Sequence, residues 1–95
     1  MKTHELRCWR EPFRAMLDGR KHFEVRIDDR GFAVGDVLCL REFDPQTNGY
    51  TGWSLRVYVD YMLRDAFDLP PGLVVMSTSV PYDIKRGQVR ETRKP

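Results

Sequence analysis

The chain has 95 residues, of which 41% are hydrophobic and 12% aromatic, and its formal net charge is +2. These values are typical of one small globular domain and exclude an intrinsically disordered chain. No apolar run approaches the roughly 20 residues that cross a bilayer, and the first residues lack the apolar stretch of a signal peptide. We therefore expect a cytoplasmic protein with no membrane contact.

The positive charge is concentrated at one end of the chain. Residues 1–79 carry 11 Lys and Arg against 12 Asp and Glu, whereas residues 80–95 carry 5 against 2. We expect residues 1–79 to form the domain and residues 80–95 to form a flexible basic tail. Arginine outnumbers lysine 12 to 4, which mildly favours a nucleic-acid partner because guanidinium binds phosphate and stacks on bases. A genome rich in G and C would produce the same bias.

The two cysteines, Cys8 and Cys39, each lie in an apolar stretch and belong to no CxxC pair. This placement predicts two buried free thiols. A structural zinc site needs four ligands with paired spacing, so we expect no metal, and we expect no cofactor.

Three elements are predicted before residue 30. His4–Trp9 reads as a strand. Pro12 suits the first turn of a short helix whose Phe13, Met16 and Leu17 share one apolar face, with Gly19 at its C-terminal end. The next strand, Lys21–Ile27, alternates two faces: one carries Phe23, Val25 and Ile27, and the other carries His22, Glu24 and Arg26.

Three further strands follow. A Gly35-Asp36 turn leads into Val37–Leu40, which is apolar enough to be buried on both faces. Tyr50–Leu63 is the longest strand, and Gly52 near its start allows a bulge or bend. Leu73–Met76 is a final buried strand. The pattern predicts an α+β fold, mostly β: a small, mostly antiparallel β-barrel with one N-terminal helix packed on it. A small open sandwich is the alternative.

The segment Gly19–Arg26 concentrates charge between helix and strand. Lys21 and Arg26 could bind a phosphate, while Glu24 accepts from a base amide or orients a cation. The structural alternative is a surface strand on which Glu24 and Arg26 form an ordinary ion pair.

The spacing Gly19-x-Lys21-x-x-Glu24-x-Arg26 resembles the GxKxxExR signature of ASCH domains. A Gly-Asp turn before a buried strand also belongs to that family. The resemblance to a small bacterial and phage branch of unassigned function covers roughly residues 3–79, and it includes His4-Glu5-Leu6-x-x-Trp9 and Tyr50-Thr51-Gly52.

This resemblance implies a PUA-like β-barrel with a cleft beside the first helix. It also implies RNA or a nucleotide as the ligand, with Lys21, Glu24 and Arg26 in the cleft. Strict strand alternation would put Lys21 and Glu24 on opposite faces. A bulge, or a Lys21 that precedes the regular strand, would resolve this conflict.

Other candidate ligand contacts lie outside this segment. Trp9 ends a strand near the expected cleft mouth, and either Arg41 or Glu42 should face the cleft or its rim because both interrupt an apolar strand. We expect most other aromatic residues to be core, including Phe13, Phe23 and Tyr61. The residues that we predict to bind nucleic acid are Lys21, Glu24, Arg26, Trp9, Arg41 and His4.

Two other classes of function remain open. An enzyme acting on RNA or a modified nucleoside is one. Some ASCH proteins are reported to be ribonucleases. To act in the same way, this chain would need an acid–base group, such as His22 or His4. Similar amidohydrolases carry a Thr three positions after the Lys, where this chain has Glu24, which favours binding over catalysis. A protein-interaction domain is the other, and an exposed apolar patch would favour it.

Overall fold

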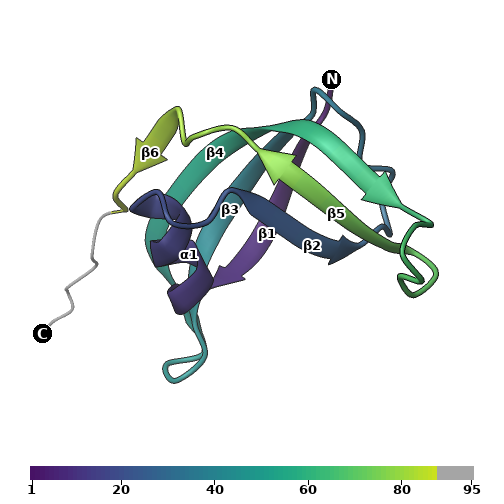
Figure 1. Cartoon of the computed structure of the whole chain (residues 1–95). Coiled ribbons are helices and arrows are strands. Elements are labelled where there is room, and N and C mark those ends of the chain that lie inside the picture. The colour runs from purple at the N-terminus through teal and green to yellow at the C-terminus, as the bar shows by residue number, and fades with distance from the viewer. Residues whose placement is uncertain (88–95) are drawn as a thin grey trace, which may run out of the picture.

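The computed structural model describes residues 1–87 (Figure 1). The elements are β1 (Thr3–Trp9), α1 (Arg10–Leu17), β2 (Phe23–Ile27), β3 (Val37–Asp44), β4 (Gly49–Arg64), β5 (Leu73–Thr78) and β6 (Asp83–Lys85). All predicted elements are present, so the α+β class dominated by strands is confirmed. No helix in residues 1–87 could span a membrane.

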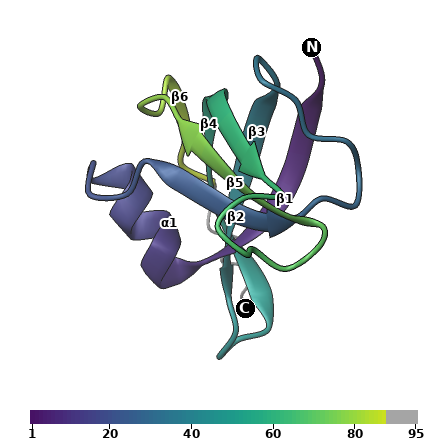
Figure 2. The same ribbon diagram turned by 45° about the vertical axis from the view of Figure 1, so that its right-hand side comes forward.

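The strands form one curled sheet in the order β1-β3-β4-β5-β2, with β6 paired to β4 off this path. β1 and β3 are parallel, and the other pairs are antiparallel. The long β4 joins the two halves, because its first part pairs with β3 and its second part with β5 (Figures 1 and 2). The first two strands of the chain, β1 and β2, lie at the two ends of this order.

The predicted closed barrel is wrong, because β1 and β2 do not pair and the sheet is open between them. We call this gap the seam. Arginine side chains cross it instead of backbone hydrogen bonds: Arg26 Nη2 donates to the Arg7 carbonyl at 2.8 Å, and Arg30 Nη1 to the Glu5 carbonyl at 3.2 Å. These contacts occupy carbonyl groups on the free edge of β1, which would otherwise be open to another strand.

The predicted irregularity at Gly52 is confirmed. The register of β3 and β4 shifts between the pairs Arg41↔Ser54 and Phe43↔Tyr50, so β4 carries extra residues there. Gly52 has φ +97°, and a Cβ at this position would lie 2.9 Å from the Gly87 Cα. Both the backbone angle and the close approach require glycine.

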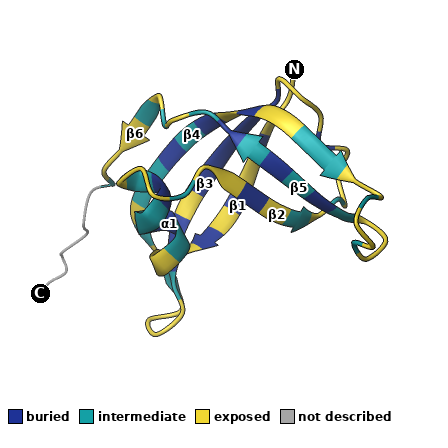
Figure 3. Ribbon diagram, viewed as in Figure 1, coloured by how far each residue is buried: buried dark blue, intermediate teal, exposed yellow. Residues whose placement is uncertain are grey.

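The core lies inside the curl of the sheet and beneath α1 (Figure 3). Phe13 and Met16 of α1 are fully buried against it, as predicted. Val37–Leu40 is buried on both faces, and both cysteines are free and buried, also as predicted. The inward strand residues include Leu6, Leu38, Leu40, Leu55, Val57, Val59, Val74 and Met76.

Phe23 and Tyr61 are not core residues, contrary to our prediction: they are 47% and 65% exposed. The inward face of β2 carries Glu24 and Arg26 instead, because this face lines a charged cleft. The outward face carries Phe23, Val25 and Ile27, which are all exposed. Alternation correctly groups residues by face, but it does not say which face is inward.

Part of the predicted tail belongs to the sheet. Asp83–Lys85 form β6, in which Ile84 pairs with Leu55 along an edge of β4, so the prediction of a flexible segment is wrong for these residues. The strand forms because the first part of β4 pairs with β3 on one side and is otherwise unpaired on the other. The rest of the predicted tail, residues 88–95, lies outside the described residues.

Candidate functional site

The end of α1 determines where Lys21 lies. Gly19 has φ +87°. Its N–H donates to the Met16 carbonyl at 3.3 Å, while the Arg20 N–H donates to the Ala15 carbonyl at 2.8 Å. This pair of hydrogen bonds is the Schellman motif, in which a residue with positive φ turns the chain away from the helix axis. Lys21 consequently precedes β2, and this resolves the conflict between the faces of Lys21 and Glu24.

Lys21, Glu24 and Arg26 form one ion cluster, which we call the Glu24 cluster. The Lys21 Nζ lies 2.5 Å from Glu24 Oε2, and the Arg26 Nε lies 3.1 Å from Glu24 Oε1. The side chains of Lys21, Glu24 and Arg26 are 16%, 5% and 26% exposed. The pairing of Glu24 with Arg26 is therefore present, but Glu24 is buried and also binds Lys21, so this is not an ordinary surface ion pair. Both oxygens of Glu24 are engaged, so this carboxylate orients two cations.

A cleft of about 330 Å³ lies along the seam, beside the start of α1. Its lining comes from β1, α1, and the segment that ends in β2: Arg7, Cys8, Trp9, Pro12, Lys21, Phe23, Glu24, Val25 and Arg26. Three cations line it against one carboxylate, so the cleft is positively charged. Trp9 and Phe23 present exposed aromatic surface from its two sides.

The thiol of Cys8 forms part of the cleft wall. Burial, and to a smaller extent the charge of Glu24, raise the pKa of Cys8 to about 11 against the opposing effects of Lys21 and Arg26. The thiol is therefore protonated at neutral pH. Because the thiolate is the nucleophilic form, Cys8 is an uncharged wall residue and not a reactive centre.

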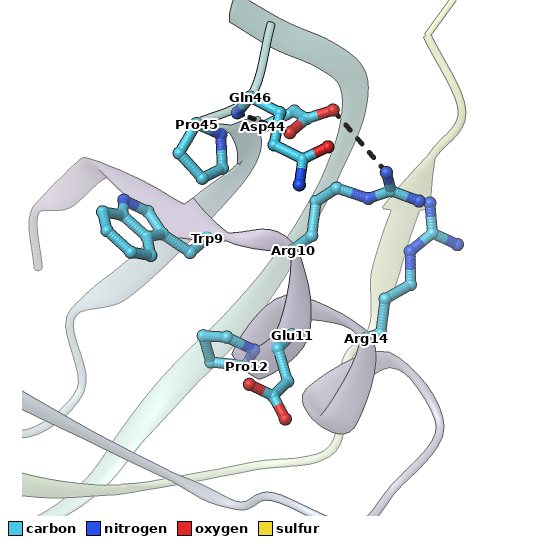
Figure 4. A pocket seen from close by; sticks show the side chains of 8 residues that line it. All are labelled: Trp9, Arg10, Glu11, Pro12, Arg14, Asp44, Pro45 and Gln46. Carbon is cyan, nitrogen blue, oxygen red and sulfur yellow. Dashed lines mark hydrogen bonds and ion pairs between the residues drawn. The ribbon is translucent and has the colours of Figure 1, made fainter. Parts of the chain in front are cut away.

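A second hollow, of about 480 Å³, also has Trp9 in its lining (Figure 4). Figure 4 shows Arg10 and Arg14 extending from α1 to the same side, with the Arg10 Nη1 3.6 Å from Asp44 Oδ2. The two hollows share Trp9 and Pro12. Trp9 and Pro12 therefore border two neighbouring hollows: three arginine or lysine side chains line the cleft, and two line the second hollow.

A buried carboxylate anchors α1 to the sheet. Glu42 is fully buried and accepts from Arg14 at 2.7 and 3.0 Å and from the Thr51 hydroxyl at 2.6 Å. Burial by itself would raise the pKa of Glu42, but the hydrogen bonds from Arg14 and Thr51 outweigh it and lower the pKa. Glu42 thus remains charged, and it holds the helix whose first turn borders both hollows.

The structure separates the predicted ligand residues into three places. Lys21, Glu24, Arg26 and Trp9 meet in the cleft. His4 is buried near the other end of β1, where its Nε2 lies 2.8 Å from Asp36 Oδ2. Arg41 is exposed on the outer face of β3, while its neighbour Glu42 points inward.

His4 and Arg41 were both predicted to bind nucleic acid, but neither of them lines the cleft. His4 is the inward residue at the start of an alternating strand, so its ring packs at 4.7 Å against Phe32. Cys8, Pro12 and Val25 also line the cleft without having been predicted, and so do Arg7 and Phe23. The sequence shows that Arg7 precedes Cys8 and that Phe23 precedes Glu24, but it does not show the seam that brings β1 and β2 together.

The fold and the cleft define a small α+β domain with a charged hollow at an open seam of its sheet. A family model described as a domain of unknown function (DUF3850) matches residues 3–78. The chain belongs to this DUF3850 family. No curated protein matches the chain. Residues 1–87 contain no group of three His, Cys, Asp or Glu side chains that could hold a metal ion.

Proposed function

We propose that the domain binds single-stranded RNA or a nucleotide in the cleft along the seam. The observation that carries this proposal is the pairing of two exposed aromatic side chains, Trp9 and Phe23, with a positively charged floor. Stacking of a base on an aromatic ring contributes about 1–3 kcal/mol. The resemblance of the Gly19–Arg26 segment to ASCH domains, PUA-like folds that bind RNA, supports the same class of ligand.

The Glu24 cluster would act as a pre-organised phosphate site in this proposal. Glu24 holds Lys21 and Arg26 at 2.5 and 3.1 Å, so little side-chain freedom would be lost when a phosphate binds. Arg26 is the more exposed of the two cations, and its guanidinium can offer further N–H groups beyond those bonded to Glu24 and Arg7. Arg7 adds a third cation at the cleft wall.

An enzyme acting on RNA or a modified nucleoside remains the alternative, and the chemistry of the cleft favours binding. Glu24 occupies the position at which the similar amidohydrolases carry a Thr, and both of its oxygens are engaged by cations. The Cys8 thiol is protonated at neutral pH. A protein that turned over labelled RNA or acylated nucleosides at high enzyme concentration would establish the alternative.

A protein-interaction domain is less well supported. The exposed face of β2, β5 and the end of β4 is apolar, with Phe23, Val25, Ile27 and Tyr61 all exposed. Three strands about 4.8 Å apart and five residues long give about 230 Å² in plan. Monomeric proteins commonly expose apolar patches of about 300–600 Å², so this patch needs no partner.

The test is the affinity for a fluorescent 10-nucleotide single-stranded RNA at low salt, measured by anisotropy. Trp9→Leu should weaken binding about 5- to 100-fold if one stacked base is lost. Arg26→Gln should weaken it and lower the salt dependence by about 0.7 in slope, the value for one phosphate contact on a single strand. Lys2→Met is the matched control, since Lys2 lies about 23 Å along β1 from Trp9. Undetectable binding by the wild-type chain, or equal affinity of all variants, would overturn the proposal.

A further inference from the structure

The outer face of β1 and β3 carries a row of arginine and aromatic side chains. β1 and β3 pair in parallel, with Arg7 opposite Arg41 and Trp9 opposite Phe43. Paired residues in a sheet point to the same face, and Arg7 and Arg41 are exposed on the face away from the core. Tyr50 of β4 pairs with Phe43 and extends this row to a third strand.

These side chains stack on one another. The Arg7 Cζ lies 4.3 Å from the centre of the Phe43 ring, and the Arg41 Cζ lies 4.0 Å from the centre of the Tyr50 ring. The two rings are themselves in edge contact, with centroids 5.3 Å apart. We call Arg7, Phe43, Tyr50 and Arg41 the arginine–aromatic ladder. Contact with a ring face holds each guanidinium in place by cation–π attraction without using its N–H groups.

The N–H donors of the ladder are largely free for a ligand. Within residues 1–87, the Arg7 side chain has no ion pair or hydrogen bond, and Arg41 has only a 3.9 Å contact with Glu5. Arg14 and Arg26 differ, because their guanidinium groups are already bonded to buried carboxylates. Two positioned guanidinium groups next to an exposed tyrosine match the chemistry of a single-stranded nucleic acid, whose phosphates pair with arginine and whose bases stack.

The ladder is continuous with the cleft. Arg7 belongs to both, since it lines the cleft and also lies over Phe43. Trp9 follows two residues further along the same face of β1. A single-stranded ligand that leaves the cleft past Arg7 would therefore meet Tyr50 and Arg41, while the buried Phe43 supports Arg7 from below.

We infer that the ladder is a second contact surface for the same ligand, so that the domain prefers an oligonucleotide of several nucleotides to a mononucleotide. This inference rests on the proposed function of the cleft. Small β-folds that bind single strands contact about 4–16 nucleotides, and a path that includes both cleft and ladder falls in this class.

The experiment compares two ligands, a dinucleotide and a 12-nucleotide single strand, each as RNA and as DNA. Arg41→Ala should weaken binding of the 12-mer roughly fivefold and lower the magnitude of its salt slope by about 0.7, while dinucleotide affinity stays unchanged. Arg41→Lys should restore part of the charge effect, and Tyr50→Leu should reproduce the loss of stacking. Arg20→Gln is the control, because it removes an exposed arginine that pairs with Asp18 outside the ladder.

The outcomes separate the ladder from the cleft. A 12-mer affinity that is the same in wild type, Arg41→Ala and Tyr50→Leu overturns the ladder and leaves the cleft proposal intact. Loss of dinucleotide binding in Arg41→Ala also overturns it, because Arg41 would then act in the cleft. Failure of the wild-type chain to bind either length overturns the proposed function itself. Preferential loss of RNA over DNA binding, or the reverse, identifies which single strand the ladder contacts.

Discussion

Replacing Lys21 should destabilise the protein as well as weaken ligand binding. The reason is the environment of Glu24: its side chain is 5% exposed, and Lys21 is one of its two partners. Removing one partner of a buried ion pair costs about 3–5 kcal/mol, whereas exposed pairs contribute about 0–1 kcal/mol. Since Lys21 is 16% exposed and Arg26 remains, we expect Lys21→Met to cost about 2 kcal/mol. For a domain of this size that loss lowers Tm by about 8–16 °C.

A double-mutant cycle separates the ion pair from other effects of the substitution. Lys21→Met, Glu24→Gln and the double variant should be compared by urea denaturation, followed by far-UV circular dichroism. The double variant should lose less stability than the sum of the two single variants, because no buried carboxylate is then left without Lys21, while Arg26 keeps its hydrogen bond to the Arg7 carbonyl. Lys2→Met, an exposed control, should change stability by less than about 0.5 kcal/mol. A Lys21→Met protein as stable as that control, or losses that simply add, would refute this account of the Glu24 cluster.

Three further predictions concern the surroundings of the cleft. Gly19→Ala should cost about 1 kcal/mol of unfolding free energy because its φ is +87°, although a Cβ there meets no atom within 4 Å; a neutral substitution in urea denaturation would contradict the helix-end geometry. Cys8 should resist alkylation by iodoacetamide at pH 8 in the native state and react fast in urea, because burial raises its pKa to about 11; rapid native labelling of Cys8, located by mass spectrometry, would contradict its burial. Burial by itself would raise the pKa of Asp28, but hydrogen bonds from the Phe32 N–H and Arg64 outweigh it and lower the pKa to about 2. The stability that Asp28 contributes is therefore fully present above the unfolded pKa and is lost as pH falls through about 2; Asp28→Asn should flatten this acid limb in pH-dependent unfolding, and an unchanged limb would contradict the assignment.

Local features of the fold were predictable because they depend on residues close in sequence. The apolar face of α1, the glycine at its end and the alternation along β4 each lie within one element. The meeting of Lys21, Glu24 and Arg26 could be predicted for the same reason, since all three lie within six residues. The stop at Gly19 turns the chain so that Lys21 precedes β2.

The features of the fold and the cleft that the sequence did not predict depend on contacts between distant segments. The inward face of β2 was predicted wrongly because Phe23 and Val25 are more apolar than Glu24, and only the opposing Lys21 and the carbonyl of Arg7 explain why a carboxylate and a guanidinium lie inside. Arg41 and Glu42 were recognised as unusual in an apolar strand. Their opposite roles, however, depend on Arg14 and Tyr50, which no local pattern connects to them.

The strand order also has a consequence for how the chain folds during synthesis. β2 lies at one end of the sheet path and pairs with β5, some 50 residues later in the chain. During synthesis, β2 therefore has no backbone partner until Leu73–Thr78 has emerged from the ribosomal exit tunnel. Chains stalled before this point should leave the positive side chains of Lys21 and Arg26 without their native framework. The candidate site is thus completed only after β5 has been made.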